Sequence, residues 1–274
     1  MNSLLIKIIG IPLAIIAIYL VACILLYSFQ NRLIFFPKKL SADAHNLAKD
    51  SSIEVLQVKV TDSKYLRGWL CKNSHQEKQN IIIYFGGNGD EVSSFVPRAK
   101  RIQGWSVVLL NYAGYGDSDG EPSEKEFFDS ALKIYDYIVS RNDVDDNNIV
   151  LMGRSIGSGV ATFLASSRPS KVVILISPFE SLSGVVKDIF GFLPVDLILE
   201  NKFDSKVYAK NVKSPLLSIY GLNYRTVRPK HSKALLKYWG GKTEVQEFNG
   251  LNHDNLINSD IMINRINDFL TKLN

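Results

Sequence analysis

The sequence has little of the residue types that mark several classes of protein. Its 274 residues include two cysteines and four histidines, too few for a disulfide scaffold and without the clustering of a metal site. It contains no internal repeat and no low-complexity segment. Hydrophobic residues make up 46% and charged residues 22% of the chain, which excludes a disordered or collagen-like protein. We expect a globular chain with neither a metal nor a cofactor.

Acidic residues are absent from the first 42 positions. The net charge is +5, and four basic residues precede the first acidic one: Lys7, Arg32, Lys38 and Lys39. Removing these four from the 32 basic residues leaves 28, against 27 acidic ones in the rest of the chain. Because the body is close to neutral, we expect no nucleic-acid partner.

A long apolar run without charge lies among these basic residues. It extends over 22 residues, Ile8–Phe29, and a helix needs about 20 such residues to cross a bilayer. Tyr19 and Tyr27 are amphipathic enough to lie near an interface. We expect residues 8–29 to form a single-pass anchor in membrane lipid, with residues 1–42 as the anchor and its basic flank.

Other interpretations of the apolar run stay open. Leu20–Cys23 is similar to a bacterial lipobox, in which Cys23 would be lipidated, although the run stays apolar for six residues beyond it. A buried core helix would normally keep a polar stripe. Basic residues after the run slightly outweigh those before it, so the positive-inside rule favours a cytoplasmic body by a small margin.

Short apolar segments alternate with amphipathic ones along the rest of the chain. Eight have the pattern of strands: Ile53–Val60, Leu66–Cys71, Ile81–Phe85, Trp105–Leu110, Asn148–Gly153, Val172–Ile176, Leu216–Tyr220 and Glu244–Phe248. Five have the pattern of helices: Val92–Gln103, Ser123–Ser140, Ile156–Ser167, Ser232–Trp239 and Asn255–Leu273. This order predicts an α/β fold with a mostly parallel eight-stranded sheet, covered by helices on both faces, and an antiparallel edge made by the first two strands.

Residues 179–212 do not follow this alternation. Their sequence predicts short helices inserted between the sixth and seventh strands. An insert at the carboxyl edge of the sheet would overhang the crevice as a small cap. We expect this cap to belong to one domain, residues 43–274.

The segment Gly153–Gly159 matches the G-x-S-x-G pattern of a nucleophile elbow, with Ser155 at its centre. A predicted strand precedes it and a predicted helix follows, which is the context the motif requires. Small residues two positions before and after the serine avoid clashes, and the helix N-terminus favours developing negative charge. We expect Ser155 to be a nucleophile; an ordinary glycine-rich turn is the alternative.

A serine nucleophile needs a base. His45 and His75 precede the central strands, and His231 begins a predicted helix. His253 directly follows the last predicted strand, in a loop at the same sheet edge as Ser155. His253 is therefore the candidate base, and an ordinary loop histidine is the alternative.

The oxyanion of such a reaction needs two backbone donors. One candidate is the amide of Ile156, directly after the serine. The other is the amide of Asn88, in the glycine-rich loop Gly86–Gly89 that follows the third strand. A phosphate loop is the alternative for these glycines, but no Lys-Ser/Thr pair follows them.

Together these segments resemble the membrane-anchored Bem46-like group of α/β-hydrolases, related to the ABHD depalmitoylating enzymes and the serine aminopeptidase-like hydrolases. The similar segments span nearly the whole chain: Gln30–Pro37, Tyr84–Asn88, Asn111–Gly120, Gly153–Gly159, Ser177–Phe179, Phe192–Pro194 and Lys202–Ser205. The resemblance implies an α/β-hydrolase fold and cleavage of an ester, thioester or amide bond. It does not specify a substrate.

The expected triad acid departs from the family pattern. In the family an Asp follows the seventh strand, with a His seven residues later. Gly221, Val227 and His231 keep this register, which puts Tyr224 at the Asp position. A phenol is neutral at pH 7 and cannot stabilise an imidazolium as a carboxylate does. Glu180, after the sixth strand, is a possible substitute acid, or else a solvated cap residue.

Two functions are compatible with this sequence. The first is a serine hydrolase (esterase, thioesterase or amidase) acting on a small or lipophilic acyl substrate near a membrane. The second is a catalytically impaired relative that serves as a membrane-bound binding or scaffold module, because Tyr224 occupies the acid position. The sequence does not indicate the oligomeric state.

Overall fold

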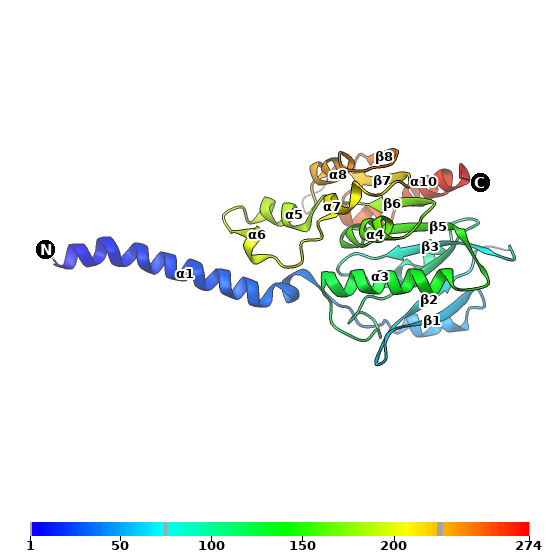
Figure 1. Ribbon diagram of the computed structural model, residues 1–274, viewed down its shortest axis with the longest axis horizontal. Coiled ribbons are helices and arrows are strands. Elements are labelled where there is room, and N and C mark those ends of the chain that lie inside the picture. The colour runs from blue at the N-terminus through cyan, green and yellow to red at the C-terminus, as the bar shows by residue number, and fades with distance from the viewer. Residues whose placement is uncertain (1, 74–75, 224–226, 274) are drawn as a thin grey trace.

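Eight strands form one sheet in the computed structural model, which describes residues 2–73, 76–223 and 227–273 (Figure 1). Their order across the sheet is β1-β2-β4-β3-β5-β6-β7-β8. The strands are β1 (Ile53–Thr61), β2 (Lys64–Cys71), β3 (Gln79–Phe85), β4 (Ser106–Leu110), β5 (Val144–Arg154), β6 (Val172–Ile176), β7 (Leu216–Gly221) and β8 (Thr243–Phe248). Each coincides with a predicted strand; β5 differs most, because it begins four residues earlier.

The sheet is mostly parallel, as predicted. β1 pairs antiparallel with β2 and β2 pairs antiparallel with β4, whereas the other neighbouring strands are parallel. Buried and exposed positions alternate along most of β1, while β3 and β4 are buried throughout. This difference is expected when helices cover both faces of the central strands but not of the edge.

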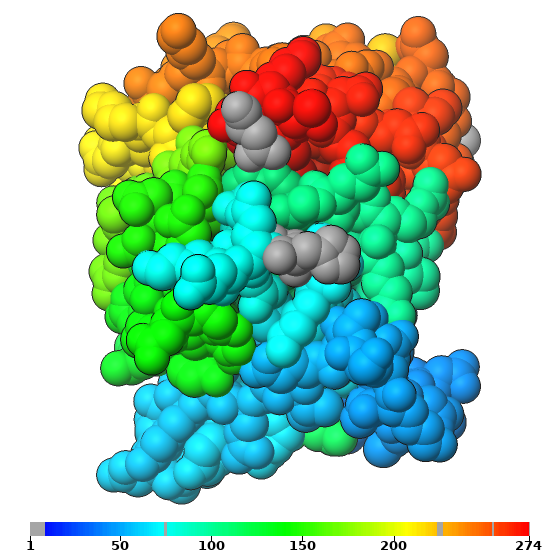
Figure 2. Space-filling view, turned by 90° about the vertical axis from the view of Figure 1, so that its right-hand side faces the viewer, coloured from blue at the N-terminus to red at the C-terminus, as the bar shows by residue number. Residues whose placement is uncertain are grey.

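Helices on both faces complete the body. They are α2 (Val96–Ala99), α3 (Glu124–Val139), α4 (Ile156–Ser167), α8 (Pro229–Leu236), α9 (His253–Leu256) and α10 (Asp260–Thr271), with 3-10 helices η1 (Asp43–Lys49) and η2 (Val92–Phe95). α3 packs on α4 through the stacked rings of Phe128 and Phe163, whose centroids are 4.1 Å apart. Figure 2 views the end of the body with α10 (red) on one side and the first strands (blue) on the other.

Three predicted helices have wrong boundaries. The helix expected over Val92–Gln103 is η2 followed by α2, because the amides of Arg101 and Ile102 bond to carbonyls three residues back and form turns. The helix expected over Asn255–Leu273 is interrupted between α9 and α10 for the same reason, since the Ser259 amide bonds to Leu256. α8 begins at Pro229, three residues early, because proline suits the first helical position.

The cap lies between β6 and β7, as predicted, and consists of α5 (Leu182–Ile189), α6 (Val195–Ile198) and α7 (Ser205–Ala209). Figure 1 shows α5 and α6 beside the part of the N-terminal helix that is nearest the body. This helix, α1 (Asn2–Ile34), otherwise projects away from the domain (Figure 1).

α1 is long and apolar enough to cross a membrane. Its segment Ile9–Ile34 has 26 residues and a mean hydropathy of 2.8, and the most apolar part of this segment contains no buried residue. A helix of this length extends about 39 Å, more than the roughly 30 Å of hydrocarbon in a bilayer. Its exposure excludes the interpretation as a buried core helix.

Candidate active site

Ser155 lies at the turn between β5 and α4 in a strained backbone conformation. Its φ is +51° and its ψ is −120°, a combination that residues other than glycine rarely adopt. Its amide donates to the carbonyl of Ile176 at the end of β6, over 2.9 Å, which ties the turn to the neighbouring strand. Strain that is held in place by surrounding structure is typical of functional sites.

The glycines on either side of Ser155 leave no room for a side chain. A Cβ on Gly153 would lie 2.2 Å from the carbonyl oxygen of Gly157. A Cβ on Gly157 would lie 2.2 Å from the carbonyl oxygen of Phe85, at the end of β3. These contacts are with backbone, which cannot move aside, so the elbow can form only with glycine at both positions.

The two predicted oxyanion donors lie at the ends of β3 and β5. Ile156 is the first residue of α4, so its amide has no acceptor within the helix. The Gly87 amide donates to Asp90 over 2.7 Å and is therefore occupied. The side chain of Asn88 donates to the Ile34 carbonyl over 2.8 Å, which fixes the position of this residue. No hydrogen bond from the Asn88 amide occurs within the part of the chain that the structure describes.

His253 begins α9, after the loop that follows β8, and lies beside the elbow. The Nη2 atom of Arg154, the residue before Ser155, is 3.3 Å from His253 Nδ1 and 3.3 Å from the His253 carbonyl oxygen. The structure therefore brings the predicted base to the residue next to the predicted nucleophile.

Arg154 is itself buried and paired with Asp90. Its Nη1 donates to both carboxylate oxygens of Asp90, over 2.7 and 2.8 Å. Burial alone would raise the pKa of Asp90, but the charge and hydrogen bonds of Arg154, with the Gly87 amide, outweigh it and lower that pKa. Asp90, Arg154 and His253 thus connect the glycine-rich loop Gly86–Gly89, the elbow and the predicted base. Sequence reasoning did not identify Asp90 or Arg154, because charged residues beside a motif carry no pattern of their own.

The contact with Arg154 decides which nitrogen of His253 carries a proton. A guanidinium group only donates hydrogen bonds, so Nδ1 accepts and the ring proton lies on Nε2. A base that takes the Ser155 proton through Nε2 needs the opposite tautomer, which a carboxylate at Nδ1 normally stabilises. The contact with Arg154 therefore favours the tautomer with the proton on Nε2, which is unsuited to general-base catalysis.

Comparison with known proteins agrees with this architecture. A family with the alpha/beta hydrolase fold matches residues 81–196. The crystal structure of an alpha-beta hydrolase from Vibrio vulnificus covers 90% of this chain and 92% of its own, with a TM-score of 0.73 at 18% identity, which shows the shared fold. Bem46 of Schizosaccharomyces pombe is 24% identical over 95% of this chain and 92% of its own length. The chain has the α/β-hydrolase fold and is related to Bem46.

Two other relatives of this α/β-hydrolase have informative names. The Saccharomyces cerevisiae protein YNL320W, named an uncharacterized membrane protein, is 28% identical over 89% of this chain and 90% of its own length. ABHD12 of Macaca fascicularis, named a lysophosphatidylserine lipase, is 31% identical over 51% of this chain and 40% of its own length.

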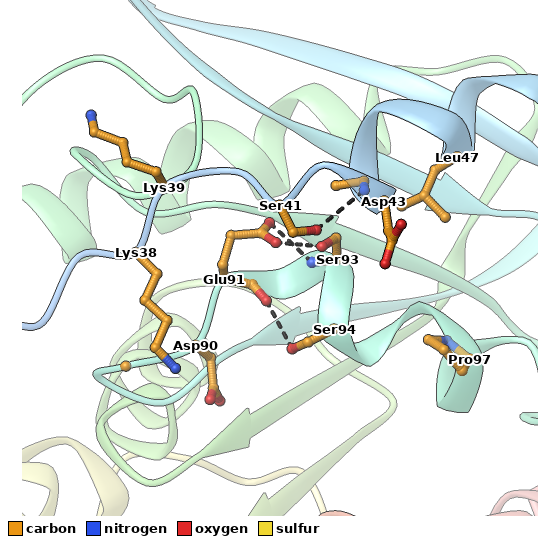
Figure 3. Close-up of a pocket in the computed structure, with 12 residues that line it drawn as sticks. Lys38, Lys39, Ser41, Asp43, Leu47, Asp90, Glu91, Ser93, Ser94 and Pro97 are labelled. Atoms are coloured by element: carbon orange, nitrogen blue, oxygen red, sulfur yellow. Dashed lines mark hydrogen bonds between the residues drawn. The ribbon is translucent and has the colours of Figure 1, made fainter.

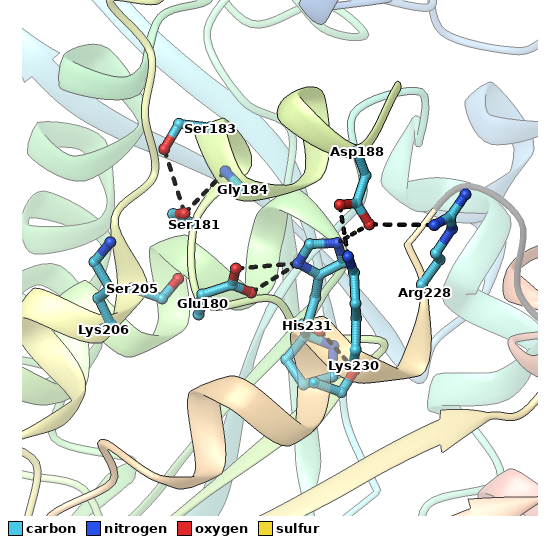
Figure 4. A network of polar contacts seen from close by, with 12 residues as sticks. Glu180, Ser181, Ser183, Gly184, Asp188, Ser205, Lys206, Arg228, Lys230 and His231 are labelled. Atoms are coloured by element: carbon cyan, nitrogen blue, oxygen red, sulfur yellow. Dashed lines mark hydrogen bonds and ion pairs between the residues drawn. The ribbon is translucent and has the colours of Figure 1, made fainter. Parts of the chain in front are cut away.

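The sequence offers two positions for a triad acid, Tyr224 and Glu180. Tyr224 lies outside the described residues. Glu180 follows β6, and its carboxylate oxygens lie 3.0 and 3.1 Å from Nδ1 of His231, in α8 (Figure 4). The structure therefore brings Glu180 together with His231, and this contact does not favour Glu180 as the acid for His253.

His231 bridges two carboxylates at the joint between cap and body (Figure 4). Its Nε2 lies 3.0 Å from Asp188 of α5, and Asp188 also pairs with Lys230 over 2.6 Å. Only 4% of the His231 side chain is exposed. The hydrogen bond to Glu180 raises the pKa of His231, outweighing the opposite effect of burial. This cluster connects α5 to α8, whereas the sequence placed His231 at the start of a helix and in the family register without indicating its partners.

A polar hollow of about 430 Å³ lies beside the glycine-rich loop Gly86–Gly89 (Figure 3). It is lined by the segment after α1 and by the loop that follows β3: Lys38, Lys39, Ser41, Asp43, Ala44, Leu47, Gly89, Asp90, Glu91, Ser93, Ser94 and Pro97. The carboxylate of Glu91 accepts from the Ser93 amide over 3.1 Å and from the Asn111 side chain over 3.0 Å, so it stabilises the loop. Neither Ser155 nor His253 lines this hollow.

Proposed function

We propose that this α/β-hydrolase is a membrane-anchored serine hydrolase that transfers an acyl group from an ester, thioester or amide to water. The observation that carries the proposal is the positive φ of Ser155 at the turn into α4. This conformation exposes a hydroxyl above a helix N-terminus, at the sheet edge where ligands bind in open α/β sheets.

In the proposed reaction His253 takes the proton of the Ser155 hydroxyl while its oxygen attacks the acyl carbonyl carbon. The amides of Asn88 and Ile156 stabilise the oxyanion that forms. The intermediate then releases an alcohol, thiol or amine, which takes the proton from His253, and the acyl group stays on Ser155. Water attacks the acyl-serine by the same route and releases the acid.

This reaction requires a change at His253. Nδ1 must carry the proton, so its contact with Arg154 has to open when substrate binds. Such a rearrangement is compatible with catalysis, because catalytic hydrogen bonds in unliganded enzymes often align only in the substrate complex.

An apolar cavity between α1 and the cap supports a lipophilic acyl substrate. It has a volume of about 150 Å³ and is lined by Leu26, Gln30, Leu33, Ile34, Val186, Phe190, Leu193, Val195, Ile198 and Leu199. Its wall is next to the oxyanion loop, since the Ile34 carbonyl accepts the side-chain hydrogen bond of Asn88. The name of the relative ABHD12, a lysophosphatidylserine lipase, points in the same direction.

The anchor of this enzyme is proposed to be residues 8–29, with residues 1–42 as anchor and flank and residues 43–274 as the catalytic domain. α1 continues without a break through Cys23 to Ile34, which disfavours a lipoprotein because such chains become polar after the lipidated cysteine. The relative YNL320W is named a membrane protein. The basic residues beside the run can contact anionic headgroups, and their balance favours a cytoplasmic domain.

A second function is favoured by two observations at His253. Tyr224 occupies the acid position in the sequence, and a guanidinium lies at Nδ1 where a carboxylate would be expected. If the contact with Arg154 does not open, the chain is a catalytically impaired module that binds acyl ligands at a membrane without cleaving them.

Hydrolysis of p-nitrophenyl esters from acetate to laurate, by the full chain in detergent micelles, separates these functions. The hydrolase proposal predicts turnover that rises with acyl length and is lost in Ser155→Ala. Ser166→Ala is a matched control, because Ser166 lies on the same helix with its hydroxyl bonded to Phe163. Wild-type turnover no faster than that of Ser155→Ala would contradict the hydrolase and favour the binding module.

A further inference from the structure

The tip of the cap, residues 189–199, lies along the half of α1 that is nearest the body (Figure 1). We propose that this cap tip is inserted into the lipid bilayer, beside α1, in the leaflet on the side of the catalytic domain. This inference rests on the proposed membrane anchor. It adds the cap tip to α1 as a second part of the chain that lies in the membrane.

Hydrogen bonds connect the cap tip to α1 at two positions along the helix, Tyr19 and Gln30. The Tyr19 hydroxyl donates to the carbonyl of Phe192 over 3.0 Å, at the end of the contact farthest from the body. Gln30 donates to the carbonyl of Ile198 over 3.1 Å, and its side-chain oxygen accepts from the Glu200 amide over 2.8 Å. The tip and the helix therefore run side by side over more than ten residues of α1.

These contacts determine the depth of the cap tip. The apolar run Ile8–Phe29 is about 33 Å long as a helix, close to the roughly 30 Å of a bilayer interior. Tyr19 is ten residues before Phe29, which places it about 15 Å inside the run, deeper than the interface position expected from its amphipathic side chain. If the run crosses the bilayer, Phe192 cannot stay in water, because it is bonded to a residue near the middle of the span.

The side chains of the cap tip suit hydrocarbon. Phe192 is 72% exposed and Leu197 is 84% exposed, and Ile189 and Phe190 are exposed too. Together they make an apolar surface that continues the exposed surface of α1, as expected of a segment in contact with lipid. Asp196 is the one charged residue of the tip, and it pairs with Lys187 of α5 over 2.5 Å.

The backbone of the cap tip is also suited to a medium without water. Unpaired backbone groups cost several kcal/mol each in hydrocarbon. Five amides of the tip donate to carbonyls within the same segment, and the Phe190 amide donates to Val186 of α5; the five are Leu193, Val195, Leu197, Ile198 and Leu199. The carbonyls of Phe192 and Ile198 accept from α1 instead. Polar groups of α1 that would otherwise face lipid thus satisfy the backbone of the tip.

Spin labels on the full chain in phosphatidylcholine vesicles test this placement. Cys23→Ser removes the half-exposed cysteine, and Cys71 is fully buried with a pKa raised to about 12, so it does not compete for the label. Labels are placed at Phe192→Cys and, as an aqueous control, at Ile261→Cys on α10, which lies far from α1 (Figure 1). A label at Leu13→Cys in α1 reports on the anchor alone.

We expect the label at residue 192 to collide several-fold more with oxygen, relative to a water-soluble nickel complex, than the label at residue 261. Accessibility at 192 equal to that at 261 overturns the proposal. The proposal is also overturned if the label at residue 192 is shielded from both reagents and shows dipolar broadening, because this would indicate that a second copy of the chain covers the tip. If the label at residue 13 is exposed to lipid and the label at residue 192 is exposed to water, only the insertion of the cap tip is refuted. If both labels are exposed to water, the proposed membrane anchor is refuted as well. None of these outcomes depends on activity at Ser155.

Discussion

Two histidines of this α/β-hydrolase lie in opposite electrostatic surroundings. His231 is bonded to Glu180 and Asp188 at 3.0 Å, whereas Nδ1 of the predicted base, His253, lies 3.3 Å from the guanidinium of Arg154. The carboxylate–histidine arrangement that a triad requires is present in the molecule, but at the joint between cap and body. A carboxylate beside a histidine therefore does not by itself identify a catalytic base, and our proposal of His253 rests on its position beside the elbow.

The largest difference between the two histidines should appear in turnover. His253→Ala removes the proton acceptor of Ser155, and we expect it to lower kcat on acyl esters by roughly 10⁴-fold or more. His231→Gln should change kcat by less than about tenfold, because His231 contacts cap and body and not Ser155. Steady-state kinetics of both variants checks this. An equal loss of turnover in the two variants would refute the assignment of His253 as the base.

Restoring an acid should have the next largest effect. Tyr224→Asp supplies a carboxylate at the position that the family uses, and it can stabilise the tautomer of His253 with a proton on Nδ1. We expect kcat to rise by roughly 10²-fold, because a whole triad contributes about 10⁶-fold and His253 already accounts for about 10⁴-fold of it. Tyr224→Phe is the matched control and should leave kcat near the wild-type value. No gain in Tyr224→Asp would mean that another group already serves as the acid, or that Arg154 still prevents catalysis.

A substitution at Glu180 tests whether the carboxylate beside His231 contributes to stability or to catalysis. Glu180→Gln weakens a charged hydrogen bond at a nearly buried histidine, so we expect the free energy of unfolding to fall by about 1–3 kcal/mol with little change in kcat. Denaturant unfolding measures this, with Glu121→Gln as a control at an exposed position. A loss of turnover without a loss of stability would instead identify Glu180 as the substitute acid.

The smallest effect should be the pH dependence of stability. Glu180 raises the pKa of His231, so the contribution of His231 to folding is complete below its ordinary pKa of 6.5 and is lost as the pH rises through the raised value. We expect the free energy of unfolding to decline above about pH 6.5, and His231→Gln to remove this part of the decline. Urea unfolding between pH 6 and 9 makes the comparison; identical pH profiles for the two proteins would contradict it.

The sequence predicted the parts of this molecule that repeat a local pattern. Alternation of apolar strands and amphipathic helices predicted the sheet, and the glycines around Ser155 predicted an elbow, because local sterics decide both. The partners of His231 and His253 could not be predicted, since Glu180, Asp188 and Arg154 approach them only through the tertiary fold. The contact of the cap with α1 was missed for the same reason: Tyr19 and Gln30 look like isolated polar residues in an apolar run until their acceptors in the cap are known.

Covalent labelling of Ser155 tests most directly the claim that this serine is an activated nucleophile. The full chain in detergent is incubated with a fluorophosphonate, and the mass of the intact protein is measured over time. We predict that the wild-type protein gains the mass of one probe and that Ser155→Ala gains none. An unmodified wild-type protein, or an adduct that persists in Ser155→Ala, would contradict the account.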